Sequence, residues 1–284
     1  MTVTHTRLGC STISFRHLPL PAALKVIAGL GFVEIDLGAL PGVCDHVPYH
    51  LDADAVDTVA CVVNDSGLRV RSINGDIGDL NAPVDGEARV RRTEHLDALL
   101  RLAQLTGARA VVLPCGAARH TPLRTLAHDL DLVATELTRA QAAAHLWGIQ
   151  IWTESLHFHR LCCDIERAAM LTDRLEDTSV GLVMDFSHIV ASGADPAEFV
   201  ARFAPRIAHV HLRDAEPGNI NLSIGHGQVD FGRGFAALDV VGYAGHFALE
   251  LETRDITDDQ RPGATAEAAH HISALIEGAT PCLN

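Results

Sequence analysis

The sequence predicts an α/β fold, a (β/α)8 TIM barrel that forms a single domain over residues 1–284. Short apolar runs recur eight times along the chain, and most are followed by a stretch with apolar residues at helical spacing. No Pro/Ser-rich linker interrupts this alternation. An open doubly wound sheet is the alternative, but eight units are more than most such sheets need, and no GxGxxG motif follows the first run.

The first half of the chain contains four of the predicted strands, which are runs of apolar and β-branched residues. These strands cover residues 7–15, 33–37, 68–73 and 110–114. The helices that follow them place apolar residues three or four positions apart, as a helix with one buried face requires. These helices cover residues 21–29, 56–65, 90–106 and 126–145.

The second half repeats the pattern. Its strands are predicted at residues 149–153, 181–184, 207–212 and 247–251. Its helices are predicted at residues 165–175, 196–203 and 266–276, with a shorter one at 235–241. In both halves, glycines precede strands in the segments GLGF, DSGL, TGAR and HLWGI, where glycine can adopt the positive φ that ends a helix.

Composition excludes several classes of protein. The 36 acidic and 22 basic residues give a formal charge of −14, which disfavours binding to nucleic acid. No apolar run approaches the roughly 20 residues of a membrane span, and the start, MTVTHTRLGC, does not resemble a signal peptide. We therefore expect a soluble cytoplasmic protein with no membrane partner.

The seven cysteines are scattered and show no CxxC spacing. They indicate neither a disulfide framework nor a thiolate zinc site. We interpret most of them as small buried hydrophobic residues.

Each of the last four predicted strands ends in an acid or an imidazole. These residues are Glu154, Asp185, His211 and Glu250. In a TIM barrel the active site lies at the C-terminal ends of the strands, and side chains alternate between the two faces of a strand. If these faces point inward, the four side chains converge. Three carboxylates and one imidazole suit one divalent metal ion, Mn, Mg or Co, and also tolerate Zn.

These four residues, and the motifs in which they stand, resemble those of the xylose-isomerase-like barrels. That family includes ketose 3-epimerases, hydroxypyruvate isomerases and inosose dehydratases. The resemblance covers nearly the whole chain. Its most specific parts are Glu154, the DxxH motif at 185–188, HxHxRD at 209–214, GxGxxDF at 225–231 and LELE at 249–252.

The resemblance implies one divalent metal held by Glu154, Asp185, His211 and Glu250, with His188 and Arg213 near the substrate. It also implies a small-molecule carbohydrate substrate and a homo-oligomer, since relatives often form dimers or tetramers.

The implied reaction is the isomerisation or epimerisation of a small keto-sugar or polyol through an enediolate. A proton on carbon beside a carbonyl is too weakly acidic for a free carboxylate, so a metal must polarise the carbonyl. Glu154 and Glu250 would flank the substrate carbon, one removing a proton and the other returning one. A lyase or dehydratase acting on a keto-sugar, keto-inositol or 3-keto-glycoside begins with the same step and stays open.

The sequence disfavours two other classes of protein. An apurinic endonuclease shares the barrel but needs further metal ligands and a basic face for DNA, which the charge of −14 disfavours. A sugar-binding barrel without catalysis is disfavoured because both candidate glutamates are present.

Further residues are predicted to contact the substrate. His157 and Arg160 follow Glu154 in the HFHR segment, and His46 lies in the loop after the second strand. Asn74, Asp76 and Asn81 lie where loops roof the site, although turn formation explains them equally well.

Other polar residues have structural interpretations. His209 is predicted to be a hydrogen-bonded core histidine and Glu34 a buried carboxylate of the barrel. Cys115 has no evident partner base, which disfavours a nucleophilic role. His226 stands between two glycines where many relatives carry an acidic residue, so we expect a different base or hydroxyl-binding group at that position.

Overall fold

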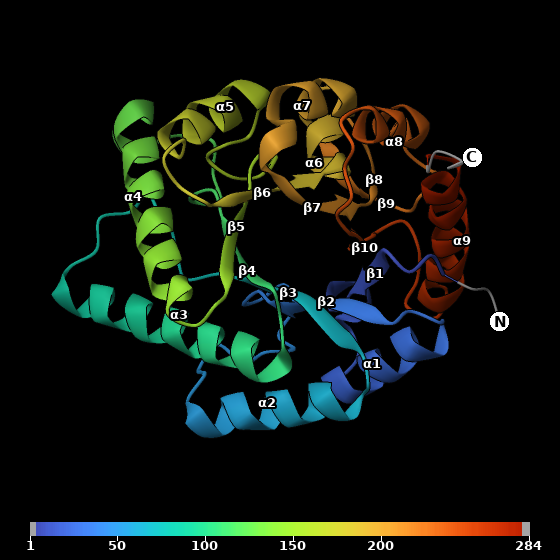
Figure 1. Cartoon of the computed structure of the whole chain (residues 1–284), viewed down its shortest axis with the longest axis horizontal. Helices are drawn as coiled ribbons and strands as arrows, with labels where there is room; N and C mark the ends of the chain where they lie inside the picture. Colours follow the sequence, from blue (N-terminus) through green and yellow to red (C-terminus); the bar gives the residue numbers. More distant parts are fainter. Residues whose placement is uncertain (1–3, 280–284) are drawn as a thin grey trace.

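Eight parallel strands close into a barrel in the computed structural model, which describes residues 4–279 (Figure 1). The order around the barrel is β1-β10-β7-β6-β5-β4-β3-β2, and each neighbouring pair is parallel. The strands are β1 Leu8–Ser11, β2 Glu34–Ala39, β3 Arg69–Gly75, β4 Ala110–Pro114, β5 Gln150–Glu154, β6 Gly181–Asp185, β7 Ile207–Leu212 and β10 Phe247–Leu249. The predicted (β/α)8 barrel is confirmed.

Helices surround the barrel (Figure 1). They are α1 Leu20–Gly29, α2 Ala53–Asp65, α3 Gly86–Thr106, α4 Leu126–His145, α5 Ile165–Arg174, α6 Phe186–Ala191, α7 Pro196–Phe203, α8 Phe231–Val240 and α9 Arg261–Ala279, with short 3-10 helices η1 Thr12–Phe15 and η2 Ala204–Arg206. Most begin at a side chain that accepts a backbone N–H, such as Asp52 of α2 and Asp164 of α5. The glycines predicted to end helices have positive φ, for example 68° at Gly107 and 69° at Gly148.

A strand, a helix and a hairpin differ from the prediction. The strand expected at 7–15 ends at Ser11, because the Ser11 hydroxyl accepts from the Ile13 backbone and caps the 3-10 helix η1. Helix α6 was not predicted, since its six residues are too few to establish a periodicity. The hairpin of β8 Asp214–Glu216 and β9 Asn219–Leu222 was also missed.

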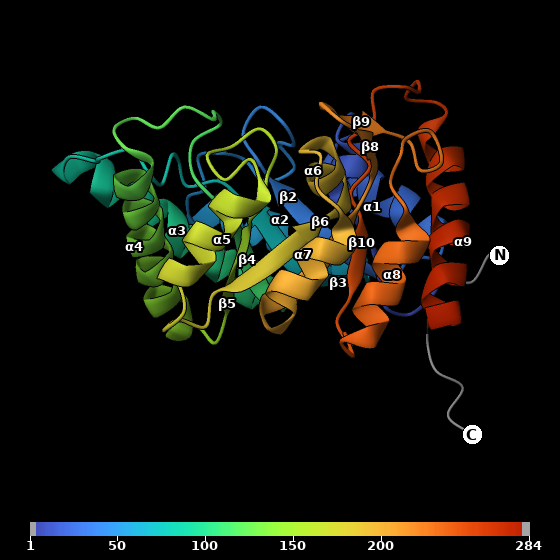
Figure 2. The ribbon, with the colours of Figure 1, turned by 90° about the horizontal axis from the view of Figure 1, so that it is seen from above.

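The barrel interior contains a small apolar cluster of Ala110, Val112, Trp152 and Val183, separate from the larger core between barrel and helices. Trp152 and Val183 stand two residues before Glu154 and Asp185, so these strand faces point inward as predicted. Figure 2 shows that the long loops and the β8–β9 hairpin gather at one end of the barrel. That end is where the strands that carry the predicted metal ligands terminate.

Four of the described cysteines, Cys10, Cys44, Cys115 and Cys162, are buried. Cys61 is exposed and Cys163 is partly exposed, so the buried interpretation does not hold for them, and Cys282 lies outside the described residues. Between residues 4 and 279, no helix combines the length and the apolar content that crossing a membrane demands.

Candidate metal and substrate site

The four predicted ligands meet at the C-terminal end of the barrel. Glu154 and Asp185 end β5 and β6, His211 lies in β7, and Glu250 directly follows β10. All four are buried, and each offers one ligand atom within 4.8 Å of the ligand atoms of the others. The structure therefore brings together the set that the strand ends predicted.

Helix α6 determines how Asp185 faces this cluster. Asp185 Oδ1 accepts the backbone N–H groups of Ser187 at 2.6 Å and His188 at 3.1 Å, as the N-cap of α6. Its other oxygen, Oδ2, is buried and has no hydrogen bond within the described residues. One carboxylate thus caps a helix with one oxygen and offers the other to the cluster.

Several buried atoms of the cluster lack hydrogen bonds to the described residues: Glu154 Oε1, Asp185 Oδ2 and His211 Nδ1. His211 Nδ1 lies 3.4 Å from Glu154 Oε1 and 3.2 Å from Glu250 Oε2. A buried polar atom without a partner costs about 1–3 kcal/mol, so their convergence is best explained by a ligand that binds all of them. Oxygen donors with one imidazole nitrogen fit a divalent cation.

Electrostatics within the cluster also fit a cation. Burial, reinforced by repulsion from Glu250 and Asp185, raises the pKa of Glu154 to about 7. Burial lowers the pKa of His211, but Glu250, Asp36 and Glu154 outweigh that effect and raise it well above its usual value. Without a metal, the cluster holds protons that a divalent cation would displace.

Asp36 lies behind His211 on β2. Its Oδ2 lies 3.3 Å from His211 Nε2 and accepts from His209 Nε2 at 2.7 Å, while Ser72 Oγ donates to Oδ1 at 2.8 Å. His209 is therefore the hydrogen-bonded core histidine that was predicted. The contact between Asp36 and His211 was not predicted. The available signal was a second acid, two residues after Glu34, on the same strand face.

Glu34 is the buried barrel carboxylate that was predicted. Arg71 Nη2 donates to its Oε2 at 3.0 Å and His246 Nδ1 donates to Oε1 at 2.7 Å. Glu34 is the first residue of β2, so these contacts lie at the opposite end of the barrel from the metal ligands.

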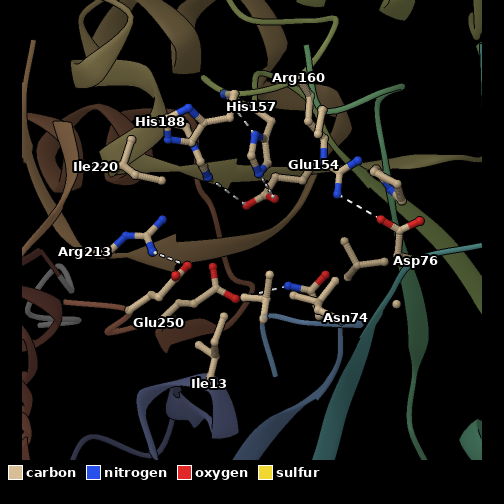
Figure 3. A pocket seen from close by; sticks show the side chains of 18 of the residues that line it. Ile13, Asn74, Asp76, Glu154, His157, Arg160, His188, Arg213, Ile220 and Glu250 are labelled. Carbon is tan, nitrogen blue, oxygen red and sulfur yellow. Dashed lines mark hydrogen bonds and ion pairs between the residues drawn. The ribbon is translucent and has the colours of Figure 1, made fainter. Parts of the chain in front are cut away.

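A cavity of about 260 Å³ adjoins the ligand cluster, because Glu154 and Glu250 belong to the cluster and also line the cavity (Figure 3). Its polar lining consists of Asn74, Asp76, Glu154, His157, His159, Arg160, His188, Arg213, Asn221, Glu250, Glu252 and Arg254. Apolar residues, including Ile13 and Ile220, complete the wall. Glu154 and Glu250 reach the cavity from opposite sides (Figure 3), whereas Asp185 and His211 do not line it.

Two stacked imidazoles adjoin Glu154. The rings of His157 and His188 are 3.8 Å apart, and their Nε2 atoms lie 3.6 Å and 4.0 Å from the Glu154 carboxylate. The Nδ1 atom of each accepts a backbone N–H, so in the neutral ring Nε2 carries the proton. Burial is the main cause that lowers the pKa of both well below the usual value, which keeps them neutral donors.

Other predicted substrate residues also line the cavity. Asn74 Nδ2 donates to Glu250 Oε1 at 3.1 Å and so orients that carboxylate. Arg160 donates to Asp76 Oδ2 and to the Gly116 carbonyl, each at 3.0 Å. Arg213 is 2% exposed and lies beside α6.

Two of the residues predicted to contact the substrate lie elsewhere. His46 does not line the cavity, because its Nε2 donates to the Leu18 carbonyl at 2.9 Å and its Nδ1 lies 3.3 Å from Cys44 Sγ. The structure thus does not bring His46 to the site. Asn81 Nδ2 donates to Asp129 Oδ2 at 2.8 Å, and Asn81 Oδ1 accepts from the Ala117 backbone N–H at 2.7 Å. Asn81 therefore has a structural role.

The expectation for His226 is corrected. The side chain is 59% exposed, its Nδ1 donates to Asp255 Oδ2 at 2.8 Å, and it lines a different groove, between the loop after β9 and helix α9. His226 therefore belongs neither to the ligand cluster nor to the lining of the cavity. The GHG segment therefore positions a loop rather than a base.

Comparison with known proteins identifies the family of this chain. Residues 24–275 match the model of the xylose isomerase-like TIM barrel. The chain belongs to this family. The resemblance inferred from the motifs is confirmed, and the ligand cluster lies within the matched range.

Curated relatives with similar sequences are named inosose dehydratase. The protein of Geobacillus thermodenitrificans (strain NG80-2) is 29% identical over 145 residues, which are 44% of this chain and 47% of the relative. That of Clostridium botulinum (strain Eklund 17B / Type B) is 31% identical over 107 residues, 31% of this chain and 35% of the relative. These matches span less than half the length of the relatives.

Solved structures share the fold over nearly the whole chain. The 3-keto-D-glucoside 4-epimerase of E. coli has a TM-score of 0.74 and 18% identity, covering 94% of this chain and 100% of the other. An L-ribulose 3-epimerase has a TM-score of 0.76 and 20% identity, covering 97% and 96%. The IolI protein with a zinc atom has a TM-score of 0.76 and 16% identity, covering 97% and 99%.

Proposed function

We propose that this protein is a divalent-metal-dependent isomerase or epimerase that acts on a small keto-sugar or polyol. One observation carries the proposal: Glu154 and Glu250 belong to the ligand cluster and also line the cavity from opposite sides, whereas Asp185 and His211 only belong to the cluster. A substrate carbon between the two glutamates has a carboxylate on each face, as proton removal and return require.

Residues around the two carboxylates support this division of roles. The Nε2–H groups of His157 and His188 point toward Glu154, and Asn74 orients Glu250. A divalent cation at the cluster, Mn, Mg, Co or Zn, would polarise the substrate carbonyl and acidify the neighbouring C–H group. Glu154 or Glu250, as a carboxylate, then accepts that proton, and the other, as a protonated carboxylic acid, delivers one to the opposite face.

A dehydratase is the second candidate, and the inosose dehydratases among the sequence relatives favour it. The first step is the same proton abstraction. In the second step the carboxylic acid that the first step leaves on Glu154 or Glu250 protonates the departing hydroxyl, and the Nε2–H groups of His157 and His188 on the cavity wall would donate hydrogen bonds to that oxygen. The two reactions differ in product mass.

Hydrogen exchange tests the proposal. The Mn-loaded protein is incubated in D2O with ketohexoses, keto-inositols and 3-keto-glycosides, and deuterium content and product mass are followed. Deuterium gained without loss of water or alcohol supports an isomerase or epimerase, whereas such loss supports the lyase. No exchange with any substrate by protein that holds metal contradicts both.

Variants of the two glutamates sharpen this test. Glu154→Gln and Glu250→Gln should each slow exchange by about 10²–10⁴-fold, because each removes a proton-transferring group. Glu34→Gln is the matched control, since Glu34 is also a buried strand carboxylate but lies at the other end of the barrel. Equal effects of all three substitutions would show that the loss arises from the fold rather than from the site.

A further inference from the structure

We propose that the substrate carries an anionic substituent, a carboxylate or a phosphate, and that Arg213 and Arg254 bind it at one end of the cavity. This inference rests on the proposed function, because it concerns the same cavity. It narrows the substrate class from any small keto-sugar or polyol to an acidic one.

Cationic groups outnumber their carboxylate partner at this end of the cavity. Glu252 Oε2 lies 3.6 Å from Arg213 Nη1, while Oε1 lies 2.8 Å from Arg16 Nη1 and 3.4 Å from Arg254 Nη2. Three guanidinium groups therefore share Glu252, and the other carboxylate near them, Asp185, lies 3.8 Å from Arg213 Nη2 and belongs to the ligand cluster. The chain as a whole carries a formal charge of −14, so this excess of positive charge is local.

Arg213 supplies the second observation. Its side chain is 2% exposed, and its only hydrogen bond to a described residue runs from Nε to Ser187 Oγ at 3.1 Å. The Nη atoms have carboxylates no nearer than 3.6 Å at Glu252 and 3.8 Å at Asp185. Arg213 lines the cavity, so an oxyanion there would accept from both Nη groups, which have no hydrogen bond to a described residue.

The opposite end of the cavity shows the contrast. Arg160 there is already satisfied, since Asp76 and the Gly116 carbonyl each accept from it at 3.0 Å. One cation with one carboxylate leaves no local excess of charge. Arg213, by comparison, lies between the cavity and Asp185, one of the metal ligands. A substituent bound by Arg213 would thus lie beside the reacting part of the substrate.

Arg254 extends the subsite to the mouth of the cavity. Its side chain is 68% exposed, and its backbone N–H bonds to the Asn221 carbonyl at 2.9 Å, which ties it to the β8–β9 hairpin. Asn221 in turn donates to the Glu252 carbonyl at 2.7 Å. The hairpin therefore holds the second guanidinium over the entrance, where it meets an incoming anion first.

Binding of unreactive polyols tests the inference separately from catalysis. Calorimetry on metal-loaded protein, freed of excess metal, compares D-glucitol with D-gluconate and with D-glucitol 6-phosphate. We expect at least one of the two anions to bind about tenfold more tightly than D-glucitol, because charge-assisted bonds to arginine are the stronger ones. The anion with the larger preference identifies the substituent.

Two variants test whether the preference for anions over D-glucitol arises from the arginine subsite. Arg254→Gln should reduce this preference about fivefold, as expected for an exposed charge. Arg233→Gln is the matched control, because Arg233 is 64% exposed and ion-paired, with Asp195 of the α7 N-cap, but lies outside the cavity. This control should keep the wild-type preference.

Equal affinity for the three polyols, or no binding of either anion, overturns the inference. So does an anion preference that survives unchanged in Arg254→Gln, since the anion then binds the metal rather than the arginines. Anion preference without hydrogen exchange on any substrate would retain this subsite but remove the proposed function. Hydrogen exchange on neutral substrates alone, without anion preference, would retain the proposed function but remove this subsite.

Discussion

At the scale of single residues, Asp36 determines which nitrogen of His211 faces the other members of the ligand cluster. Nε2 of His211 lies 3.3 Å from Asp36 Oδ2, so Nδ1 turns toward Glu154 and Glu250. His209 and Ser72 hydrogen-bond to Asp36 and fix its position. A carboxylate behind a metal-binding histidine both orients the ring and increases its basicity.

Asp36→Asn should weaken metal binding by about 10- to 100-fold, because a neutral amide replaces the negative charge that lies 3.3 Å from His211 Nε2. Calorimetric titration with Mn measures the change. Ser72→Ala is the control, since it removes one hydrogen bond to Asp36 and leaves the histidine contacts in place. Wild-type affinity in Asp36→Asn would show that His211 is held in place by packing alone.

Metal affinity should also rise with pH. In the metal-free protein the pKa of Glu154 is raised to about 7 and that of His211 well above its usual value, so both hold protons in acidic solution. A metal must displace these protons, and its affinity therefore increases as pH rises through about 6 to 8. Titrations in buffers of different ionisation enthalpy should detect the released protons. Constant affinity with no proton release would contradict the assignment of these two residues as ligands.

At the scale of elements, Asp214 and Gly227 shape the loop between β9 and α8. Asp214 Oδ1 accepts the backbone N–H groups of Ala215 at 2.8 Å and Val229 at 3.1 Å, and Oδ2 accepts that of Gly225 at 2.8 Å. A Cβ at Gly227 would overlap Asp214 Oδ1 and the Ala215 carbonyl. The RD and GxGxxDF motifs therefore form one structural unit.

Gly227→Ala should lower the free energy of unfolding by about 1–3 kcal/mol, because the methyl group forces Asp214 and the loop apart. Denaturant unfolding measures the loss. Gly232→Ala serves as the control, since a Cβ there would meet nothing nearer than Asp230 Oδ1 at 3.6 Å. If the two substitutions had the same effect, the close approach at Gly227 would not be what requires glycine.

At the scale of the whole molecule, the ligand cluster links strands that are far apart in sequence. Its members come from β5, β6, β7 and the residue after β10, which span residues 154 to 250. A cation bound there binds only the folded barrel, because the unfolded chain does not bring these groups together. Binding of a metal at this cluster would therefore be coupled to the stability of the entire barrel.

Metal should stabilise the fold by about 2.7 kcal/mol at a concentration one hundred times its dissociation constant. For a chain of this size that corresponds to a rise of roughly 5–10 °C in Tm. Calorimetric scans with Mn, Mg, Co or Zn, and with a chelator, measure the effect. Identical scans under all these conditions would show that the cluster binds none of them.

The sequence by itself determined the barrel and the residues of the ligand cluster, because both follow from local regularities. Strand and helix periodicity count the units, and alternation along parallel strands places Glu154, Asp185, His211 and Glu250 on inner faces at one end. The sequence also indicated His157, Arg160, His188 and Arg213, all of which line the cavity.

Only the tertiary structure decided which polar residues contact one another. It paired Asp36 with His211, gathered Arg16, Arg213 and Arg254 around Glu252, and placed His46 and His226 away from the cavity. These contacts join residues from different strands and loops whose separation no periodicity encodes. Loop conformation and side-chain packing set them, and both depend on the closed barrel.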